Sequence, residues 1–445
     1  MEKDIDKTQE QLKLWCSAPG IEFVSKEAEE AYKKRAKRIA DAIQLKKPDR
    51  VPIVPMWEYF YARYSNVSCY DVLYNTEIAR SAARKTIIEL EPDAYQAPLF
   101  FNLGPLYDSL DLKELRWPGH GIVLDKGHQF VEDEYMKADE YEALINDPSD
   151  FMLRTYLPRV CGNLKAFEAL SPFRDMFSYY TMYTPLASLG TEEGVEACRA
   201  LLKTAEASLN YVKFLSSFDK EMSRLGFPAI FGGIALAPFD AIADTLRGTQ
   251  GAILDMYRQP EVLKEACEKF VWILLDMAVS AAKISGGSII FIPLHKGTAS
   301  TPDGKGGFMS LKQFEEFYWP TLRKLMLRLI DVGLVPNLLI EGDYTSRLEI
   351  IKDVPRGTCI YHFEQVDIRK AKKILGNHVC IRGSVPIQLM CTSTPQEVKD
   401  YCKELIDVLG EGGGFIMDAS CASEDAKPEN VKAMIDFTKE YGVYK

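Results

Sequence analysis

From Phe227 to the C-terminus, short apolar runs alternate with longer amphipathic stretches of helical period. The apolar runs are 229–231, 288–293, 335–341, 358–363, 379–382 and 414–418. The helical stretches are 311–332, 346–352, 368–375, 395–409 and 428–441. Strands that alternate with helices form βαβ units and a parallel sheet. No glycine-rich phosphate-binding motif follows any run, which favours a closed (β/α)8 barrel over an open nucleotide-binding sheet.

The N-terminal half predicts three further parts. Residues 1–48 form a helical extension, in which Lys26 to Leu45 is amphipathic and a proline follows at Pro48. The β-branched run 50–56 suits the first strand of the barrel. Prolines and glycines break the segment 98–155, which predicts a hairpin-like insertion that is either a lid near the barrel mouth or an edge decoration. The expected organisation is therefore an extension at 1–48 and one barrel at 49–445, a length that barrels with insertions reach.

Composition and charge restrict the class of partner. The chain has 445 residues, 47% of them hydrophobic and 27% charged, and contains no uncharged apolar run long enough to span a bilayer. The N-terminus is charged and lacks the pattern of a signal peptide, so the cytoplasm is the expected location. A formal net charge of -10 argues against nucleic acid as a partner. Ten cysteines without CxxC spacing read as mostly buried thiols in a reducing compartment. Small molecules and other proteins remain as expected partners.

Ionisable residues end five consecutive apolar runs. In a barrel, reactive residues collect at the carboxyl ends of the strands, so these run ends are where chemistry is expected. The residues, in chain order, are His295, Glu341 with Asp343, His362 with Glu364, Arg382, and Asp418 with Cys421. The concentration of such groups at neighbouring strand ends predicts an active site there.

Three of these residues are candidate metal ligands. Glu341, His362 and Cys421 offer an oxygen, a nitrogen and a sulfur, all of which Zn²⁺ accepts, and a site with three protein ligands leaves a position open for substrate. The same residues also fit structural roles: Cys421 as a buried thiol, His362 as a hydrogen-bonded core imidazole and Glu341 as an ion-pair partner of Arg382. The residues by themselves leave both interpretations open.

Aromatic residues near the ends of extended segments suggest a pocket for a planar ligand. We single out Trp57, after the first strand, and Tyr180, in a strand-like segment with Tyr179 and Tyr183, as candidate substrate contacts. Packing in the core is the alternative for both. The glycine-rich segment 304–307 after His295 is either a mobile loop that gates the mouth or a surface turn.

Several motifs resemble the uroporphyrinogen decarboxylase superfamily, from about Pro48 to the C-terminus. They are 47–52 (KPDRVP), Phe239-Asp240 through Arg247-Gly248, Asp255 to Pro260, Ser310 to Pro320, and above all 427–434 (KPENVKAM). The resemblance implies the (β/α)8 fold. The arginine-rich motif and the early aspartate of the true decarboxylases have no match, because 57–59 (WEY) and 96–98 (QAP) stand there. The chain is more similar to the cobalamin-dependent methyltransferase branch.

That branch typically binds zinc through a His-x-Cys pair after one strand and a cysteine after the last strand. Cys421 corresponds to the last ligand, whereas the His-x-Cys position reads Leu339-Ile340-Glu341. His362, one strand later, is the proposed substitute for the lost histidine. Some relatives that demethylate aromatic methyl ethers also use Glu and His ligands, and this is the pattern that the chain resembles. Fewer thiolates leave a more strongly Lewis-acidic zinc, which suits an ether oxygen better than a thiol.

The resemblance implies transfer of a methyl group from a methoxylated aromatic to the Co(I) corrinoid of a partner protein. Zn²⁺ would be the resident cofactor, and Asp343, His295 or Arg382 would assist the leaving oxygen. One rival is a methyltransferase of the same branch with another donor or acceptor, such as methanol, a methylamine-derived corrinoid or a thiol. The other is a metal-free decarboxylating or binding barrel that grips a carboxylated ligand.

Overall fold

Six parallel strands form the main sheet of the protein, whose computed structural model describes residues 2–299 and 307–445. Their order in the sheet is their order in the chain. The strands are β4 (Gly233–Ile234), β5 (Ile289–Leu294), β6 (Val335–Asp343), β7 (Ile360–Gln365), β8 (Cys380–Arg382) and β9 (Phe415–Ile416). Five of them, β5 to β9, overlap the predicted apolar runs, and β4 begins two residues after the run 229–231, so the predicted parallel βαβ arrangement is confirmed.

Two short extended segments close this sheet into a ring. On one side, Ile53 forms a parallel bridge with Met417, and Val54 N–H donates to the Met417 carbonyl at 3.1 Å. On the other side, Tyr95 forms a parallel bridge with Ala229 beside β4. The segments also join each other, since the N–H of Asp93 donates to the Ile53 carbonyl at 2.8 Å. Six strands and two strand segments make the eight-membered barrel that the sequence predicted.

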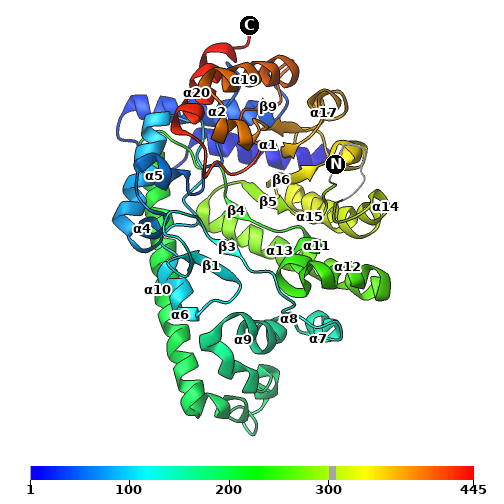
Figure 1. Ribbon diagram of the computed structural model, residues 1–445. Helices are drawn as coiled ribbons and strands as arrows, with labels where there is room; N and C mark the ends of the chain where they lie inside the picture. The colour runs from blue at the N-terminus through cyan, green and yellow to red at the C-terminus, as the bar shows by residue number, and fades with distance from the viewer. Residues whose placement is uncertain (1, 300–306) are drawn as a thin grey trace.

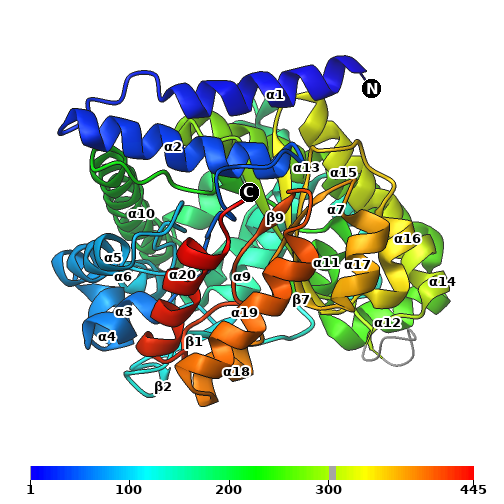
Figure 2. The ribbon, with the colours of Figure 1, turned by 90° about the horizontal axis from the view of Figure 1, so that it is seen from above.

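Helices follow the strands and surround the barrel (Figures 1 and 2). After the first strand segment come α3 (Phe60–Ser65), α4 (Cys69–Tyr74) and α5 (Thr76–Leu90), and the long α10 (Glu192–Arg224) comes after the second. After β4 come α11 (Pro238–Ile242), η5 (Ala243–Arg247), α12 (Gly248–Arg258) and α13 (Pro260–Ser285). The rest are α14 (Leu311–Gln313), η6 (Phe314–Tyr318), α15 (Trp319–Asp331), η7 (Thr345–Arg347), α16 (Leu348–Ile351), α17 (Ile368–Leu375), α18 (Ile387–Thr392), α19 (Pro395–Leu409) and α20 (Pro428–Tyr441).

The N-terminal extension covers the amino ends of the barrel strands. It consists of α1 (Glu2–Ser17) and α2 (Lys26–Ile43), which lie side by side across one end of the molecule (Figure 2). Leu12, Ile39 and Ile43 pack in one buried cluster with the innermost layer of strand residues, such as Val335 and Ile360. The opposite end of the barrel, where the strands terminate, therefore has to carry any open site.

An excursion between the second strand segment and α10 stands beside that open end (Figure 1). It contains a small sheet of β1 (Leu115–Pro118), β2 (Gly121–Ile122) and β3 (Gln129–Phe130), in which β3 pairs antiparallel with β1. The remaining elements are α6 (Gly104–Leu110), α7 (Tyr141–Asn146), α8 (Pro148–Phe151), η1 (Met152–Tyr156), α9 (Leu157–Val160), η2 (Gly162–Ala169), η3 (Phe173–Phe177) and η4 (Thr184–Gly190). The predicted hairpin-like piece exists, but irregular structure continues beyond residue 155.

The segment around Tyr179 to Tyr183 is not a strand, contrary to the sequence expectation. It is a series of turns between η3 and η4. The hydroxyl of Thr181 donates to the Asp175 carbonyl at 2.5 Å, and the hydroxyl of Thr184 donates to the Thr181 carbonyl at 2.7 Å. Such local side-chain bonds compete with strand pairing, and the aromatic composition alone could not reveal them.

Two further expectations from the sequence concern membrane-spanning segments and the glycine-rich loop 304–307. Among the described residues, no helix is long and apolar enough to cross a membrane. The predicted gating loop at 304–307 lies outside the described residues except for Gly307.

Candidate active site

Side chains on each strand alternate between the barrel interior and the surrounding helices, and this alternation sorts the polar residues into layers. On β6, Val335 belongs to the innermost layer and Leu339 to the next apolar cluster, which also contains Met56 and Phe291. Glu341 follows two residues further out. The outermost layer, which we call the mouth, collects the partly exposed ends of the strands.

His295, after β5, is held at the mouth by two aspartates. Its Nδ1 lies 2.6 Å from Oδ2 of Asp244, and its backbone N–H donates to Asp240 at 2.8 Å. Burial acts to lower the pKa of His295, but the hydrogen bond to Asp244 and the charges of Asp240 and Glu341 outweigh burial and raise the pKa to about 9. His295 is therefore a cation at neutral pH whose Nε2 points towards Glu341, 3.6 Å from Oε1.

Within the described part of the chain, Asp240, Asp244 and His295 are the one group whose ligand atoms lie close enough together to hold a metal ion, within 4.8 Å of one another. Their oxygens already have donors. The Tyr318 hydroxyl donates to Asp240 at 2.7 Å, and Lys296 Nζ lies 3.1 Å from Asp244 Oδ1. A cation here would have to displace the Lys296 ammonium, so the group as it stands orients and charges His295.

Glu341 also belongs to a second group, which consists of acidic and thiol side chains. Glu364, at the end of β7, accepts a hydrogen bond from the Gly342 N–H at 2.7 Å. Burial, followed by the nearby charges of Glu364 and Glu341, raises the pKa of the Cys421 thiol to about 12. Burial also raises the pKa of Glu341, although the His295 charge opposes it. Glu341, Glu364 and Cys421 thus form a partly exposed cluster that repels added negative charge; we call it the mouth cluster.

Another carboxylate pair extends this acidic surface. Burial and the charge of Glu424 raise the pKa of Glu58 well above its usual range, and Glu341 adds to the effect. The backbone of Glu58 is in the left-handed region, with φ 45°, a conformation that residues other than glycine rarely adopt. A strained backbone conformation of this kind persists only where contacts with the surrounding structure hold the residue in place. The pair shares its protons instead of carrying two charges.

His362 lies one layer below the mouth cluster, contrary to the expectation that it completes a ligand set with Glu341. Leu339, not Glu341, is opposite His362 in the register of β6 and β7. The ring is fully buried, and its Nε2 lies 2.7 Å from the Ala419 carbonyl, which can only accept, so Nε2 carries the proton. Burial and then the Arg382 charge lower its pKa well below the usual range.

Arg382 is part of this interior layer and not of the mouth. Its guanidinium is buried and donates to Asp418 at 3.0 Å, to the Val54 carbonyl at 2.9 Å and to Asn337 at 3.3 Å. The sequence allowed an ion pair between Arg382 and Glu341, but Arg382 pairs with Asp418 instead. We call Asn337, His362, Arg382 and Asp418 the interior network.

Three other candidates also differ in position from the expectation. Asp343 caps the turn after β6, accepting from the Thr345 N–H at 2.8 Å. Trp57 is fully buried and packs on Phe60 and Tyr61, with ring centroids 6.0 and 5.4 Å away. Tyr180 is 69% exposed in the turns between η3 and η4, and η4 packs on η2 and α10. The structure does not bring Trp57 and Tyr180 to one pocket.

The sequence reasoning missed Asp240, Asp244, Glu58 and Glu424 as site residues. Asp240 and Asp244 lie in α11 and η5, four residues apart, so both face the same side of one helical turn. Two aspartates at this spacing after a strand indicate a possible site, but in the sequence Phe239-Asp240 indicated only the family resemblance. Glu58 and Glu424 come from opposite ends of the barrel sequence, and no local pattern pairs them.

Residues 126–136, which we call the strap, run along one side of the mouth. At one end Lys126 Nζ lies 2.8 Å from both carboxylate oxygens of Asp425. At the other end Glu132 accepts from the Thr249 N–H at 2.8 Å, and Arg247 donates to Glu134 at 2.6 Å and to the Met136 carbonyl at 2.5 Å. Polar contacts at both ends fix the strap over the edge of the site.

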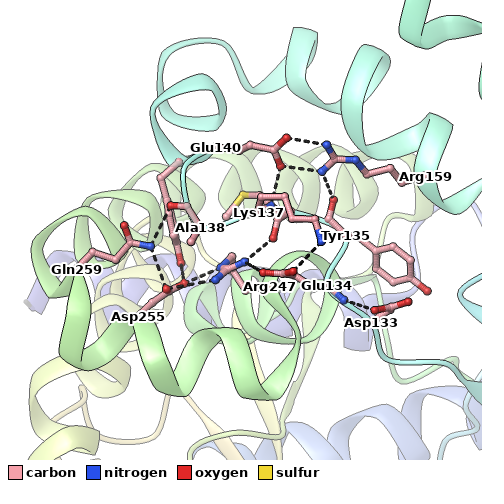
Figure 3. A network of polar contacts seen from close by, with 12 residues as sticks. Asp133, Glu134, Tyr135, Lys137, Ala138, Glu140, Arg159, Arg247, Asp255 and Gln259 are labelled. Carbon is pink, nitrogen blue, oxygen red and sulfur yellow. Dashed lines mark hydrogen bonds and ion pairs between the residues drawn. The ribbon is translucent and has the colours of Figure 1, made fainter.

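Arg247 also links this strap to the barrel helices (Figure 3). Its Nε lies 2.6 Å from Oδ2 of Asp255, which in turn accepts from the Tyr141 hydroxyl at 2.8 Å and from Gln259 at 2.9 Å. The motif Arg247-Gly248 with Asp255 therefore has a structural role, namely to join the excursion to α12.

Comparisons with known proteins agree with this architecture. A methyltransferase from Methanosarcina mazei has a similar structure with a TM-score of 0.56, 15% sequence identity, and 92% of this chain and 98% of that chain covered, which shows a shared fold. A B12-independent methionine synthase from Shewanella sp. W3-18-1 matches with a TM-score of 0.33, 13% identity, and 47% of this chain and 61% of that chain covered, too weakly to support an argument.

Sequence comparison gives the family. No curated protein matches the sequence significantly. The family model described as uroporphyrinogen decarboxylase (URO-D) matches residues 196–441, which is more than half of the chain. The match covers β4 to β9 and therefore includes His295, Glu341 and Cys421. The chain belongs to the uroporphyrinogen decarboxylase family.

Proposed function

We propose that this protein is a zinc-dependent methyltransferase that moves a methyl group from a methoxylated aromatic to the cobalt of a corrinoid carried by a partner protein. The observation that carries the proposal is the mouth cluster of Glu341, Glu364 and Cys421 beside the protonated His295. The methyltransferase fold of the M. mazei protein supports it.

The donor types of the mouth cluster are those of a zinc site, although its ligand atoms are not all within 4.8 Å of one another as the side chains stand and would have to move together around an ion. Zn²⁺ accepts carboxylate oxygens and thiolate sulfur. In the absence of a cation, burial and then the nearby negative groups keep the Cys421 thiol protonated, with a pKa of about 12. A divalent cation would remove this repulsion and favour the thiolate. We assign Glu341 and Cys421 as ligands, with Glu364 in the position first given to His362, because His362 already bonds the Ala419 carbonyl. Zinc would supply Lewis acidity towards an ether oxygen.

His295 is the best placed group to supply a proton. When the methyl carbon leaves the ether oxygen for the cobalt, the electron pair of the broken bond stays on the oxygen, which then needs a proton. Asp244 holds Nδ1 at 2.6 Å, so Nε2 is the ring atom that faces the mouth. The backbone N–H bond to Asp240 fixes the ring at the end of β5. We therefore assign the proton donor to His295 and not to Asp343 or Arg382, whose side chains are held by a turn and by Asp418.

The acidic character of the mouth speaks against the rival that grips a carboxylated ligand. Such a site needs a free arginine or lysine, but Arg382 is buried against Asp418 and Lys296 is bound to Asp244 and Glu132. The carboxylates Glu341 and Glu364 would repel a second carboxylate. An uncharged ether fits this surface better.

The test combines metal content with methyl transfer. Purified protein is analysed for zinc and mixed with a Co(I) corrinoid protein and a methoxylated aromatic, with methanol, methylamine or a thiol in parallel, while cobalamin absorbance reports transfer. We expect near-stoichiometric zinc and transfer from the ether. Glu341→Ala and Cys421→Ala should lose both, whereas Glu261→Ala, a carboxylate whose side chain is 86% exposed on α13, should lose neither. Full activity in either mouth variant contradicts the proposal, and transfer from another donor alone contradicts the ether.

A further inference from the structure

The strap is attached to the excursion at its centre and rests on the barrel on both sides of that attachment. At the centre, β3 pairs with β1, and the Val131 N–H donates to the Glu114 carbonyl at 2.7 Å. Each of the residues 126–134 is exposed or half-buried, whereas Tyr135 and Met136 beyond them are buried. Segments with few buried apolar contacts open locally at a small part of the free energy of global unfolding. Residues 126–134 can therefore leave the barrel while β1 stays in place.

The near end of the strap lies directly on Tyr59 and Glu424. A Cβ atom at Gly127 would come within 2.8 Å of Tyr59 Cδ2 and 3.1 Å of Glu424 Oε1. The next residue, His128, packs its ring on Phe100 with the centroids 4.5 Å apart, and its Nδ1 lies 3.3 Å from the Tyr59 hydroxyl. Tyr59 is 2% exposed, so its ring has little room to move away. This close approach requires glycine, and it covers one carboxylate of the acidic surface at the mouth.

The far end of the strap is tied to the proposed proton donor by a chain of ion pairs. Glu132 accepts from the Thr249 N–H at 2.8 Å, and its Oε2 lies 3.2 Å from Lys296 Nζ. Lys296 also lies 3.1 Å from Asp244 Oδ1, and Asp244 holds His295 through its other oxygen. Burial acts to raise the pKa of Glu132, but the bonds from Thr249 and the Lys296 charge outweigh burial and lower the pKa. Glu132 is therefore a carboxylate at neutral pH, and the strap reaches both sides of the mouth.

We propose that residues 126–134 are a gate at the mouth that swings on β1 as one unit, opening to admit the small-molecule substrate and closing to exclude water. Only 129–131 separate the contacts of Gly127 and His128 from those of Glu132, and these three residues are extended beside β1. Release at one end therefore weakens the hold at the other. The gate rests on the mouth being the active site, as in the proposed function, but not on the identity of the methyl donor.

The test disturbs one end of the gate and measures opening at the other end. Hydrogen exchange of the purified full chain is read at single amides by mass spectrometry, and the Thr249 N–H, bonded to Glu132, reports the far end. Gly127→Ala wedges the near end, so we expect exchange at Thr249 to be at least about tenfold faster. The Val131 N–H, which bonds β1, should exchange as in the wild type. Gly190→Ala is the matched control, because a Cβ atom there meets nothing within 4 Å.

His128→Ala is a second variant at the near end and does not depend on the wedge. It removes the ring packing and the contact with the Tyr59 hydroxyl, so we expect exchange at Thr249 to be roughly three- to tenfold faster. His120→Ala removes a histidine of the same excursion that packs on Trp117 of β1, with ring centroids 4.6 Å apart, and should leave Thr249 unchanged. Circular dichroism and thermal melting show that each variant folds.

Three results would overturn the gate. Exchange at Thr249 that stays at the wild-type rate in folded Gly127→Ala and His128→Ala means that the two ends do not move together. Equal acceleration at Val131 and Thr249 means that the excursion unfolds and does not swing on β1. Exchange at Thr249 in the wild type as slow as in the core of β6 means that the strap opens only on global unfolding. Exchange is measured without donor or corrinoid protein, so failure of the gate is distinct from failure of methyl transfer.

Discussion

The mouth cluster and the interior network lie at successive depths of the same barrel end, as Glu364 and His362 do two residues apart on β7, and use the same kinds of side chain to opposite effect. In the interior network, Arg382 and Asp418 neutralise each other and are fully enclosed. At the mouth, Glu341 and Cys421 have no matching cation beyond His295 among the described residues, and remain partly exposed. An ionisable residue at a strand end is thus available to a ligand only where the barrel does not supply it with a partner of opposite charge.

The largest effect is expected from breaking the interior network. Arg382→Met leaves Asp418 buried without its partner, and the loss of one member of a buried ion pair costs about 3–5 kcal/mol of unfolding free energy. Urea unfolding followed by circular dichroism measures it. Arg199→Met, which removes an exposed pair with Glu196, serves as a control and should cost less than about 1 kcal/mol. Equal costs for the two variants would mean that the interior network is not a structural element.

At the mouth, the loss should fall on catalysis and not on stability. His295→Gln removes the proton donor, and we expect methyl transfer to slow by about 100-fold, the lower range for a general acid. Zinc content should not change, because the mouth cluster and not His295 holds the metal in our proposal. Single-turnover transfer and metal analysis give both numbers. Loss of zinc in this variant would instead make His295 a ligand.

A smaller effect is expected in the pH dependence of stability, to which His362 of the interior network contributes. His362 is kept neutral in the folded protein, whereas in the unfolded chain it binds a proton as pH falls below about 6.5. The unfolded state then binds more protons, so stability falls by about 1.4 kcal/mol per pH unit below that point. Urea unfolding of chelator-treated protein between pH 7 and pH 5 measures this slope. In His362→Gln the slope should be less steep by one proton; an unchanged slope would show that the interior imidazole takes up a proton after all.

The smallest change is expected at the strap. Lys126→Ala removes an exposed ion pair with Asp425, so unfolding free energy should change by less than about 1 kcal/mol. Because the strap borders the mouth, we expect the change in KM for the donor to be the more visible one. Lys137→Ala, which loses a similarly exposed pair with Glu134 near the far end of the strap, is the matched variant. Identical KM values in wild type and Lys126→Ala would separate the strap from substrate binding.

The positions of β5 to β9 and of the polar strand ends were predictable from sequence, because alternation and helical period are local properties of the chain, whereas β4 lies two residues after its predicted run. The layer of each residue follows from the same two-residue period once the strand is known. Up to Ile340 that period holds and pairs Leu339 with His362, which puts His362 one layer below Glu341; the register then shifts between Ile340 and Asp343, so the period alone does not pair Glu341 with Glu364. His362 and Glu364 stand near the same strand end but belong to different layers, because successive inward-facing positions of a strand differ in depth.

Local sequence patterns specified a parallel barrel with ionisable strand ends, the family motifs, and the position of Glu341 near the end of β6 and of Cys421 after β9. Only the tertiary structure decided that Arg382 pairs with Asp418, that Asp244 holds His295 and that Glu58 meets Glu424. Partners of this kind depend on the stagger between strands and on how loops return over the mouth. These are non-local properties, since bringing distant segments together is decided by the packing of the whole barrel and not by any one stretch of residues.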